Sequence, residues 1–144
     1  MRGWLLDTNV VSELRKTNCH VEVQAWADAQ LAEDFYLSTI TIAEIRYGIE
    51  RQADADFRRE LTAWLERSLR SWFGDRILPV DEDVILEWRR MVDEGRVQGI
   101  VFSQPDLFIA ATARLHDLCV ATRNVADFEP AGVAVFNPWT DHWE

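Results

Sequence analysis

Residues 4–9 read Trp4-Leu5-Leu6-Asp7-Thr8-Asn9, an apolar run that meets an acidic residue where a short strand would end. Four later runs are similarly short and rich in β-branched or aromatic residues: residues 35–38, 76–78, 118–122 and 133–136. The segments between them carry apolar residues at helical spacing, as in Phe57, Leu61, Trp64, Leu65, Leu69 and Trp72. Because parallel strands need crossover connections, this alternation predicts an α/β fold with a mostly parallel sheet of about five strands covered on both faces.

The length and net charge of the chain limit the classes of protein to which it can belong. Its 144 residues suit one domain, so we expect a single domain over residues 1–144. No apolar run is long enough to cross a bilayer, and Asp7 comes too early for a signal peptide, so we expect a cytoplasmic protein without membrane contacts. The net charge of −10 argues against nucleic-acid binding by bulk electrostatics, but not against an enzyme with a local basic strip. Because Lys16 is the only lysine, phosphate contacts would fall mainly to arginines such as Arg15, Arg46, Arg51 and Arg123.

Acidic residues fall where an α/β sheet collects functional side chains. Asp7 follows the first predicted strand, and Asn124 and Asp127 follow the fourth. Glu44 lies in the helix after the second strand, and Asp106 opens the helix before the fourth. Sites in open α/β sheets form beyond the carboxyl ends of the strands, so these side chains can meet if the first, second and fourth strands are neighbours. Clustered carboxylates would then bind Mg²⁺ or Mn²⁺, as in many enzymes that act on phosphate esters.

Each acid also has a purely structural interpretation. Asp7-Thr8-Asn9 could turn the chain and cap the next helix. Thr41 with Glu44, and Ser103 with Asp106, match the capping-box pattern, and Asp127 could cap or end a turn. The combination of acids on one expected edge of the sheet favours a shared site over separate caps.

Four segments, in order along nearly the whole chain, resemble the PIN-domain family, and most closely its VapC and FitB branch, the toxins of bacterial toxin–antitoxin pairs. They are Leu6-Asp7-Thr8-Asn9-Val10-Val11-Ser12-Glu13-Leu14, Thr41-Ile42-Ala43-Glu44-Ile45-Arg46-Tyr47-Gly48-Ile49, Pro105-Asp106 with Ala110-Ala111-Thr112-Ala113, and Thr122-Arg123-Asn124-Val125-Ala126-Asp127-Phe128 with Asn137-Pro138-Trp139. Any one of these motifs is weak, but four in order with this spacing are specific.

The resemblance implies a Mg²⁺- or Mn²⁺-dependent ribonuclease with a three-layer α/β/α PIN-like fold. Such a protein is often a homodimer, acts on RNA, and is held inactive by a cognate antitoxin in a heterotetramer or larger complex. The residues that match the acidic triad are Asp7, Glu44 and Asp106. The fourth position falls to Asp127, which is slightly favoured, or to Asn124. Asp127 could be a direct ligand, an outer acid or a structural cap, and Asn124 could be a neutral ligand or could position water. The residues expected to support ligands and water are Thr8, Asn9 and Thr122.

Other side chains suggest contacts with substrate or partners. Tyr47, Gly48 and Arg51 share the helix face of Glu44, so Arg51 could meet phosphate or an acid of the antitoxin. Tyr47 could stack near the site, although packing explains Tyr47 and Gly48 equally well. Trp64 and Trp72 could offer an apolar ridge to a second subunit or to an antitoxin helix.

Other functions fit the sequence less well. A haloacid-dehalogenase-like phosphatase needs a second Asp where the chain has Asn9, and a response-regulator receiver needs a late lysine that the chain lacks. The remaining alternative is a catalytically silent PIN-like module that acts only through protein contacts. It would have little reason to keep Asp7, Glu44 and Asp106 together against their mutual repulsion.

Overall fold

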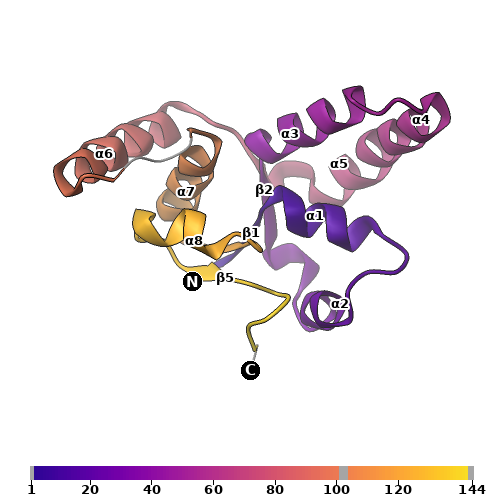
Figure 1. The fold of residues 1–144 in the computed structure, drawn as a ribbon, viewed down its shortest axis with the longest axis horizontal. Coiled ribbons are helices and arrows are strands. Elements are labelled where there is room, and N and C mark those ends of the chain that lie inside the picture. Colours follow the sequence, from indigo (N-terminus) through magenta and orange to yellow (C-terminus); the bar gives the residue numbers. More distant parts are fainter. Residues whose placement is uncertain (1, 101–103, 143–144) are drawn as a thin grey trace.

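The computed structural model describes residues 2–100 and 104–142, which form an α/β fold around one parallel sheet (Figure 1). The strand order is β3-β2-β1-β4-β5. The bounds are β1 (Gly3–Leu6), β2 (Phe35–Ser38), β3 (Ile77–Leu78), β4 (Leu118–Ala121) and β5 (Val135–Phe136). Every neighbouring pair is parallel. The predicted fold class is confirmed, although three strands are shorter than predicted. Thr122, for example, still donates its N–H to the carbonyl of Phe136 at 3.0 Å but ends the regular ladder of β4.

Helical segments connect the strands. The α-helices are α1 (Thr8–Arg15), α2 (Val21–Asp28), α3 (Thr39–Glu50), α4 (Ala55–Ala63), α5 (Arg70–Phe73), α6 (Glu82–Gln98), α7 (Gln104–His116) and α8 (Val125–Phe128). Three single 3₁₀ turns add η1 (Ala32–Asp34), η3 (Gly74–Arg76) and η4 (Glu129–Ala131). The helix predicted by the apolar spacing from Phe57 to Trp72 is present, but a π-helical segment, η2 (Trp64–Leu69), lies between α4 and α5. In the described part of the chain, no helix combines the length and apolar character needed to cross a membrane.

Alternate residues of the central strands enter two separate cores. Trp4 and Leu6 of β1 pack into the core beneath α1 to α5, whereas Leu5 enters the core beneath α6 to α8. Figure 1 shows α1, α2, α4 and α5 on one side of the sheet and α6, α7 and α8 on the other. Burying each large apolar side chain contributes about 1.5–3 kcal/mol, so the two cores fix the helices on both faces.

The acids can cluster only if the first, second and fourth strands are neighbours, and the strand order meets this condition. β1 lies between β2 and β4, so the carboxyl ends of these three strands are adjacent. Leu6 pairs with Ala121 in the β1–β4 register. The next residue on each strand, Asp7 and Thr122, therefore emerges at the same point of the sheet edge.

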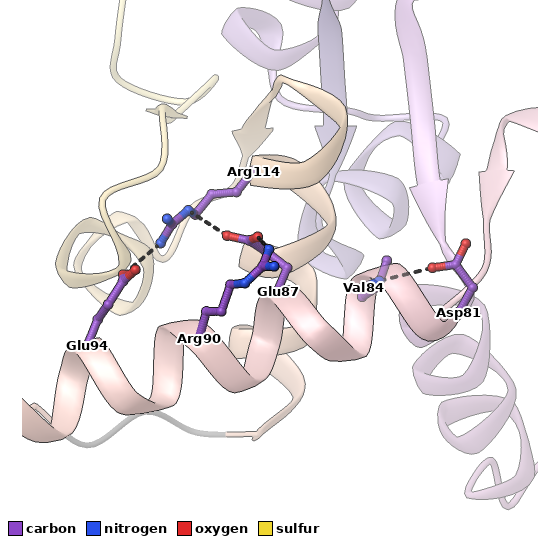
Figure 2. A network of polar contacts seen from close by, with 6 residues as sticks. All are labelled: Asp81, Val84, Glu87, Arg90, Glu94 and Arg114. Atoms are coloured by element: carbon purple, nitrogen blue, oxygen red, sulfur yellow. Dashed lines mark hydrogen bonds and ion pairs between the residues drawn. The ribbon is translucent and has the colours of Figure 1, made fainter.

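Polar contacts fix α7, the helix that carries Asp106, against α6 (Figure 2). Asp81 caps α6 by accepting the N–H of Val84 at 3.0 Å. Figure 2 shows Arg114 of α7 reaching between Glu87 and Glu94 of α6, with N···O distances of 3.3 and 3.1 Å. Each half-exposed pair contributes little free energy alone, but one arginine bridging two turns of α6 holds the helices in a single register.

Candidate active site

Asp7 combines a capping role with a place in the candidate site. Its N–H donates to the carbonyl of Ala121 at 3.0 Å, which extends the β1–β4 contact by one residue. It is the N-cap of α1, where Oδ1 accepts the N–H of Thr8 at 2.9 Å. The residue is only 6% exposed. The capping interpretation is therefore correct for Oδ1, and it leaves Oδ2 for other contacts.

Oδ2 of Asp7 lies in a network that joins the ends of β1 and β4. It accepts the hydroxyl of Thr122 at 2.8 Å and Nδ2 of Asn9 at 3.4 Å. Asn9 Nδ2 also donates to the Thr122 hydroxyl at 3.3 Å, and its Oδ1 accepts the N–H of Arg123 at 3.1 Å. The Thr122 hydroxyl in turn accepts the N–H of Asn124 at 3.0 Å. These bonds hold two distant segments of the chain together around one carboxylate.

Glu44 comes from the second turn of α3, and the predicted capping box around it is wrong. The N-cap of α3 is Ser38, whose hydroxyl oxygen accepts the N–H of Ile40 at 3.0 Å. The helix starts directly after β2, so Thr41 lies inside it, and its buried hydroxyl has no hydrogen-bond partner among the described residues. Glu44 Oε2 instead accepts the hydroxyl of Thr8 at 3.2 Å, which links α3 to the start of α1.

Asp106 and Asp127 lie in the first turns of two other helices, α7 and α8. Asp106 lies in the first turn of α7, whereas its predicted capping partner, Ser103, lies outside the described residues. Asp127 lies inside α8, and the N-cap position there belongs to Asn124, whose side chain makes no capping hydrogen bond. The interpretation of Asp127 as a cap is therefore wrong, whereas its N–H does end a turn, because it donates to the carbonyl of Asn124 at 3.1 Å.

The electrostatics connect all four acids. Burial raises the pKa of Asp7, and the charges of Asp106 and Asp127 raise it further, against the hydrogen bonds from Thr122 and Thr8 that lower it. Although Glu44 exposes much of its surface, removal of water from its carboxylate raises its pKa, as do the charges of Asp7 and Asp106. Four segments that are distant in sequence thus bring their carboxylates within electrostatic range at one edge of the sheet.

The donors suit a hard divalent cation in kind. They are carboxylates, with amide and hydroxyl oxygens beside them, which is the ligand set that Mg²⁺ and Mn²⁺ prefer. Within residues 2–100 and 104–142, however, no three acidic, histidine or cysteine side chains form a ready-made ligand set for a metal ion. The composition of the site therefore fits a cation, and binding one would require these mutually repelling carboxylates to move closer together.

Arg51 lies about two helical turns beyond Glu44, at the end of α3. It follows Glu44 by seven residues, or about 10 Å along the axis, and forms the C-cap of α3. Its guanidinium contacts Tyr47, with Nη1 3.5 Å from the hydroxyl and the guanidinium carbon 5.7 Å from the ring centroid. Tyr47 itself is 60% exposed and lines an open groove of about 510 Å³ beside Glu44. Arg51 and Tyr47 thus form a pair on α3, and Tyr47 brings this pair to the groove.

Two features of the site escaped the sequence patterns. Ser38 had a signal, because a serine just before a helix is a typical N-cap even where it also ends a strand, and the later Thr41 obscured it. The second feature is a contact between Arg123, which follows Thr122, and Trp139, which follows β5. The guanidinium carbon of Arg123 lies 5.1 Å from the centroid of the Trp139 ring. No local pattern relates these two residues.

Comparison with known proteins matches this chain to a family. The PIN domain family matches residues 4–129. Toxin FitB of Neisseria gonorrhoeae is 42% identical over 137 residues, which cover 95% of this chain and 99% of FitB. VapC ribonuclease Y4jK of Sinorhizobium fredii is 39% identical over 135 residues, which cover 94% of this chain and 96% of that protein.

Solved structures agree with the sequence matches. The crystal structure of FitAcB from Neisseria gonorrhoeae has a TM-score of 0.89 at 42% identity, and the match covers 95% of this chain and 99% of that chain. The structure of FitAB bound to an IR36 DNA fragment has a TM-score of 0.88 at 40% identity, with 98% and 97% covered. In each of these comparisons, the match covers almost the whole length of both proteins. This chain belongs to the PIN-domain family, within its branch of VapC and FitB toxins.

Proposed function

We propose that this chain is the toxin of a toxin–antitoxin pair, an endoribonuclease that hydrolyses RNA phosphodiester bonds with a bound Mg²⁺ or Mn²⁺. The observation that carries the proposal is the gathering of carboxylates from four separate segments at one edge of the sheet, where burial and the charges of neighbouring acids raise the pKa of Asp7 and Glu44. Strong similarity to a toxin and to a VapC ribonuclease, over nearly the whole chain, supports the same function.

The residues that would hold the cation are Asp7, Glu44, Asp106 and Asp127. A divalent cation would offset their repulsion, stabilise the charge that develops on a phosphodiester and acidify the attacking water. Thr122 and Thr8 keep the Asp7 carboxylate in one orientation, and Thr8 also holds Glu44. Thr8 thus links Asp7 and Glu44, since each of the two carboxylates accepts a hydrogen bond from it.

Asp127 is the better candidate for the fourth acidic position. Its charge acts on Asp7, which indicates that its carboxylate faces the same site. Asn124 contacts the site through its backbone N–H, which donates to the Thr122 hydroxyl at 3.0 Å. We therefore assign Asp127 to the cation and Asn124 to the support of Thr122.

We further propose that a cognate antitoxin covers an apolar groove on the face of the sheet that carries α1. This groove, of about 350 Å³, is lined by residues from α1, β2 and the segment from η2 to η3, including Leu14, Trp64, Trp72 and Phe73. Trp72 is 64% exposed, and Arg15 and Arg76 also line the groove. In a chain with a net charge of −10, an apolar groove with two cations suits an amphipathic helix that carries acidic residues. We expect a homodimer that joins this antitoxin in a heterotetramer or larger complex.

The function can be tested with the purified protein, stripped of antitoxin. It would be incubated with a mixed set of structured RNAs and either Mg²⁺, Mn²⁺ or EDTA. We expect cleavage with either cation, loss of cleavage in EDTA, recovery when excess Mn²⁺ is added back, and inhibition by the antitoxin. A folded protein that cleaves none of these RNAs under any condition would favour the catalytically silent binding module instead.

A further inference from the structure

The backbone of Arg123 is fixed to the acidic site. Arg123 directly follows Thr122, the residue that donates its hydroxyl to Asp7. The N–H of Arg123 donates to Oδ1 of Asn9 at 3.1 Å, and Nδ2 of Asn9 contacts Asp7. The backbone from which this side chain extends is therefore held in place relative to the carboxylate of Asp7.

The guanidinium of Arg123 rests on a ring that the C-terminal turn holds in place. The guanidinium carbon lies 5.1 Å from the centroid of Trp139, within the range of a cation–π contact. The N–H of Trp139 donates to Oδ1 of Asn137 at 2.9 Å, and Asn137 exchanges two 2.8 Å hydrogen bonds with Asp141. Trp139 also packs against the core beneath α1. The ring is therefore a fixed platform for an otherwise exposed arginine.

This arrangement places an exposed positive charge on the residue that follows Thr122, without an ion pair to the acids that the structure describes. Among the described residues, no carboxylate forms an ion pair with Arg123, whereas Arg70 and Arg114 pair with glutamates on their own or neighbouring helices. An arginine that stacks through its planar face keeps its N–H donors at the edge of the plane, where they can form a bidentate contact with phosphate. A cation held in this way is available to an anion that comes from outside the protein.

We propose that Arg123 binds a phosphate of the RNA next to the phosphodiester that lies at the acids, and that Trp139 positions it. The inference rests on the proposed ribonuclease function. RNA is an anion, and a chain with a net charge of −10 repels it at long range. A cation one residue from Thr122 offsets that repulsion where the substrate backbone must approach the site. Arg123 thus favours binding of a polyanion such as RNA, and this contribution does not require the metal ion.

The test measures binding rather than cleavage. A labelled single-stranded oligoribonucleotide would be titrated with Asp7→Asn protein, with and without Arg123→Gln, from about 50 to 200 mM salt. Arg123→Gln should weaken binding about fivefold at low salt, the upper range for one exposed charge contact. It should also reduce the slope of log K against log salt by about 0.7, the value for one phosphate of a single strand.

Two further variants separate a phosphate contact from a change in structure. Arg89→Gln, on α6, removes the same charge from another exposed arginine and should change neither affinity nor slope. Arg123→Lys keeps the charge but lacks the planar fork, so it should retain the wild-type slope with weaker binding. An unchanged slope in Arg123→Gln would overturn the proposal, whether or not the affinity falls.

The remaining outcomes also decide the proposal. If Arg123→Gln leaves RNA binding unchanged but weakens binding of the antitoxin, Arg123 belongs to the protein interface and the proposal is wrong. If wild-type protein cleaves the oligoribonucleotide while Arg123→Gln binds it normally, the inference alone fails. If the wild-type protein neither binds nor cleaves RNA, the proposed function fails and the inference fails with it.

Discussion

The hydroxyl of Thr122 donates a 2.8 Å hydrogen bond to Oδ2 of Asp7, across the ends of two neighbouring strands. The β1–β4 register places these residues side by side, because the residues before them, Leu6 and Ala121, are paired. Burial and neighbouring acids raise the pKa of Asp7, and this bond is the strongest of the influences that lower it. The pairing of two strands therefore helps to keep a buried acid ionised.

Replacing Thr122 by valine keeps the shape of the side chain but removes this bond. The pKa of Asp7 should then rise further, so protons would compete with the cation up to a higher pH. We expect the acid limb of the pH–rate profile for RNA cleavage to move to higher pH, with about 1 kcal/mol of stability lost. Thr122→Ser keeps the hydroxyl and should retain the wild-type profile. A Thr122→Val profile that coincides with that of the wild type would contradict this role.

Asp7→Asn should stabilise the protein in the absence of metal. The folded-state pKa of Asp7 is raised above its ordinary value of 3.8, so the charged form destabilises the fold. Asp7 therefore makes the wild type lose stability as pH rises from that value through the raised pKa, and the asparagine variant lacks this contribution. Urea unfolding in EDTA from about pH 4 to pH 8 should show a stability gap that widens with pH in favour of Asp7→Asn. A stability gap that narrows as pH rises would show that the pKa of Asp7 is not raised in the folded protein.

Two glycines give a matched pair of alanine substitutions. Gly48 lies inside α3, where an added Cβ would meet nothing within 4 Å, so Gly48→Ala should stabilise the helix by about 0.5–1 kcal/mol. At Gly3 a Cβ would lie 2.5 Å from the carbonyl oxygen of Asp34, so Gly3→Ala should destabilise by about 1–3 kcal/mol. Thermal unfolding of the dilute protein measures both. If Gly48→Ala lowers the melting temperature, another surface covers α3 at that point.

Trp72→Ala tests the groove proposed for the antitoxin. Trp72 is 64% exposed, so its loss should cost little stability but should remove a large aromatic contact with the partner. Calorimetric titration with the cognate antitoxin should show affinity reduced by about 30-fold, which corresponds to a hot-spot loss of about 2 kcal/mol. Leu86→Ala, on α6, truncates another exposed apolar residue and should bind the antitoxin normally. Equal affinities for the two variants would place the antitoxin elsewhere.

The sequence patterns predicted the fold well because local features determined it. Each buried strand was short and apolar, and the residues after β1 and β4 were polar. The start of α3 was wrong because two serine or threonine residues, Ser38 and Thr41, satisfied the same local rule for a cap. Ser38 is the N-cap because β2 ends at this residue. The helix must begin directly after it to bury Ile42, Ile45 and Ile49 against the sheet.

What escaped prediction depends on contacts between distant segments. The strand order fixes which acids meet, and it follows from pairing that no periodicity records. The bond from Arg123 to Asn9 joins residues 114 positions apart, and the Trp139 ring reaches Arg123 only because β5 lies beside β4. Family resemblance indicated the polar residues Thr8, Asn9 and Thr122, but the hydrogen bonds that define their positions come from the fold.

The most direct test of the proposed metal-dependent ribonuclease is single-turnover RNA cleavage in Mn²⁺ by wild type, Asp7→Asn and Asp83→Asn. The last variant removes an exposed acid from the first turn of α6, whose charge is not among those that raise the pKa of Asp7 or Glu44, as a matched control. We expect Asp7→Asn to lose at least about 100-fold in rate, since changes even to residues behind metal ligands cost 10–100-fold. Asp83→Asn should cleave at the wild-type rate. Cleavage by Asp7→Asn at the wild-type rate would show that Asp7 is not at the centre of the active site.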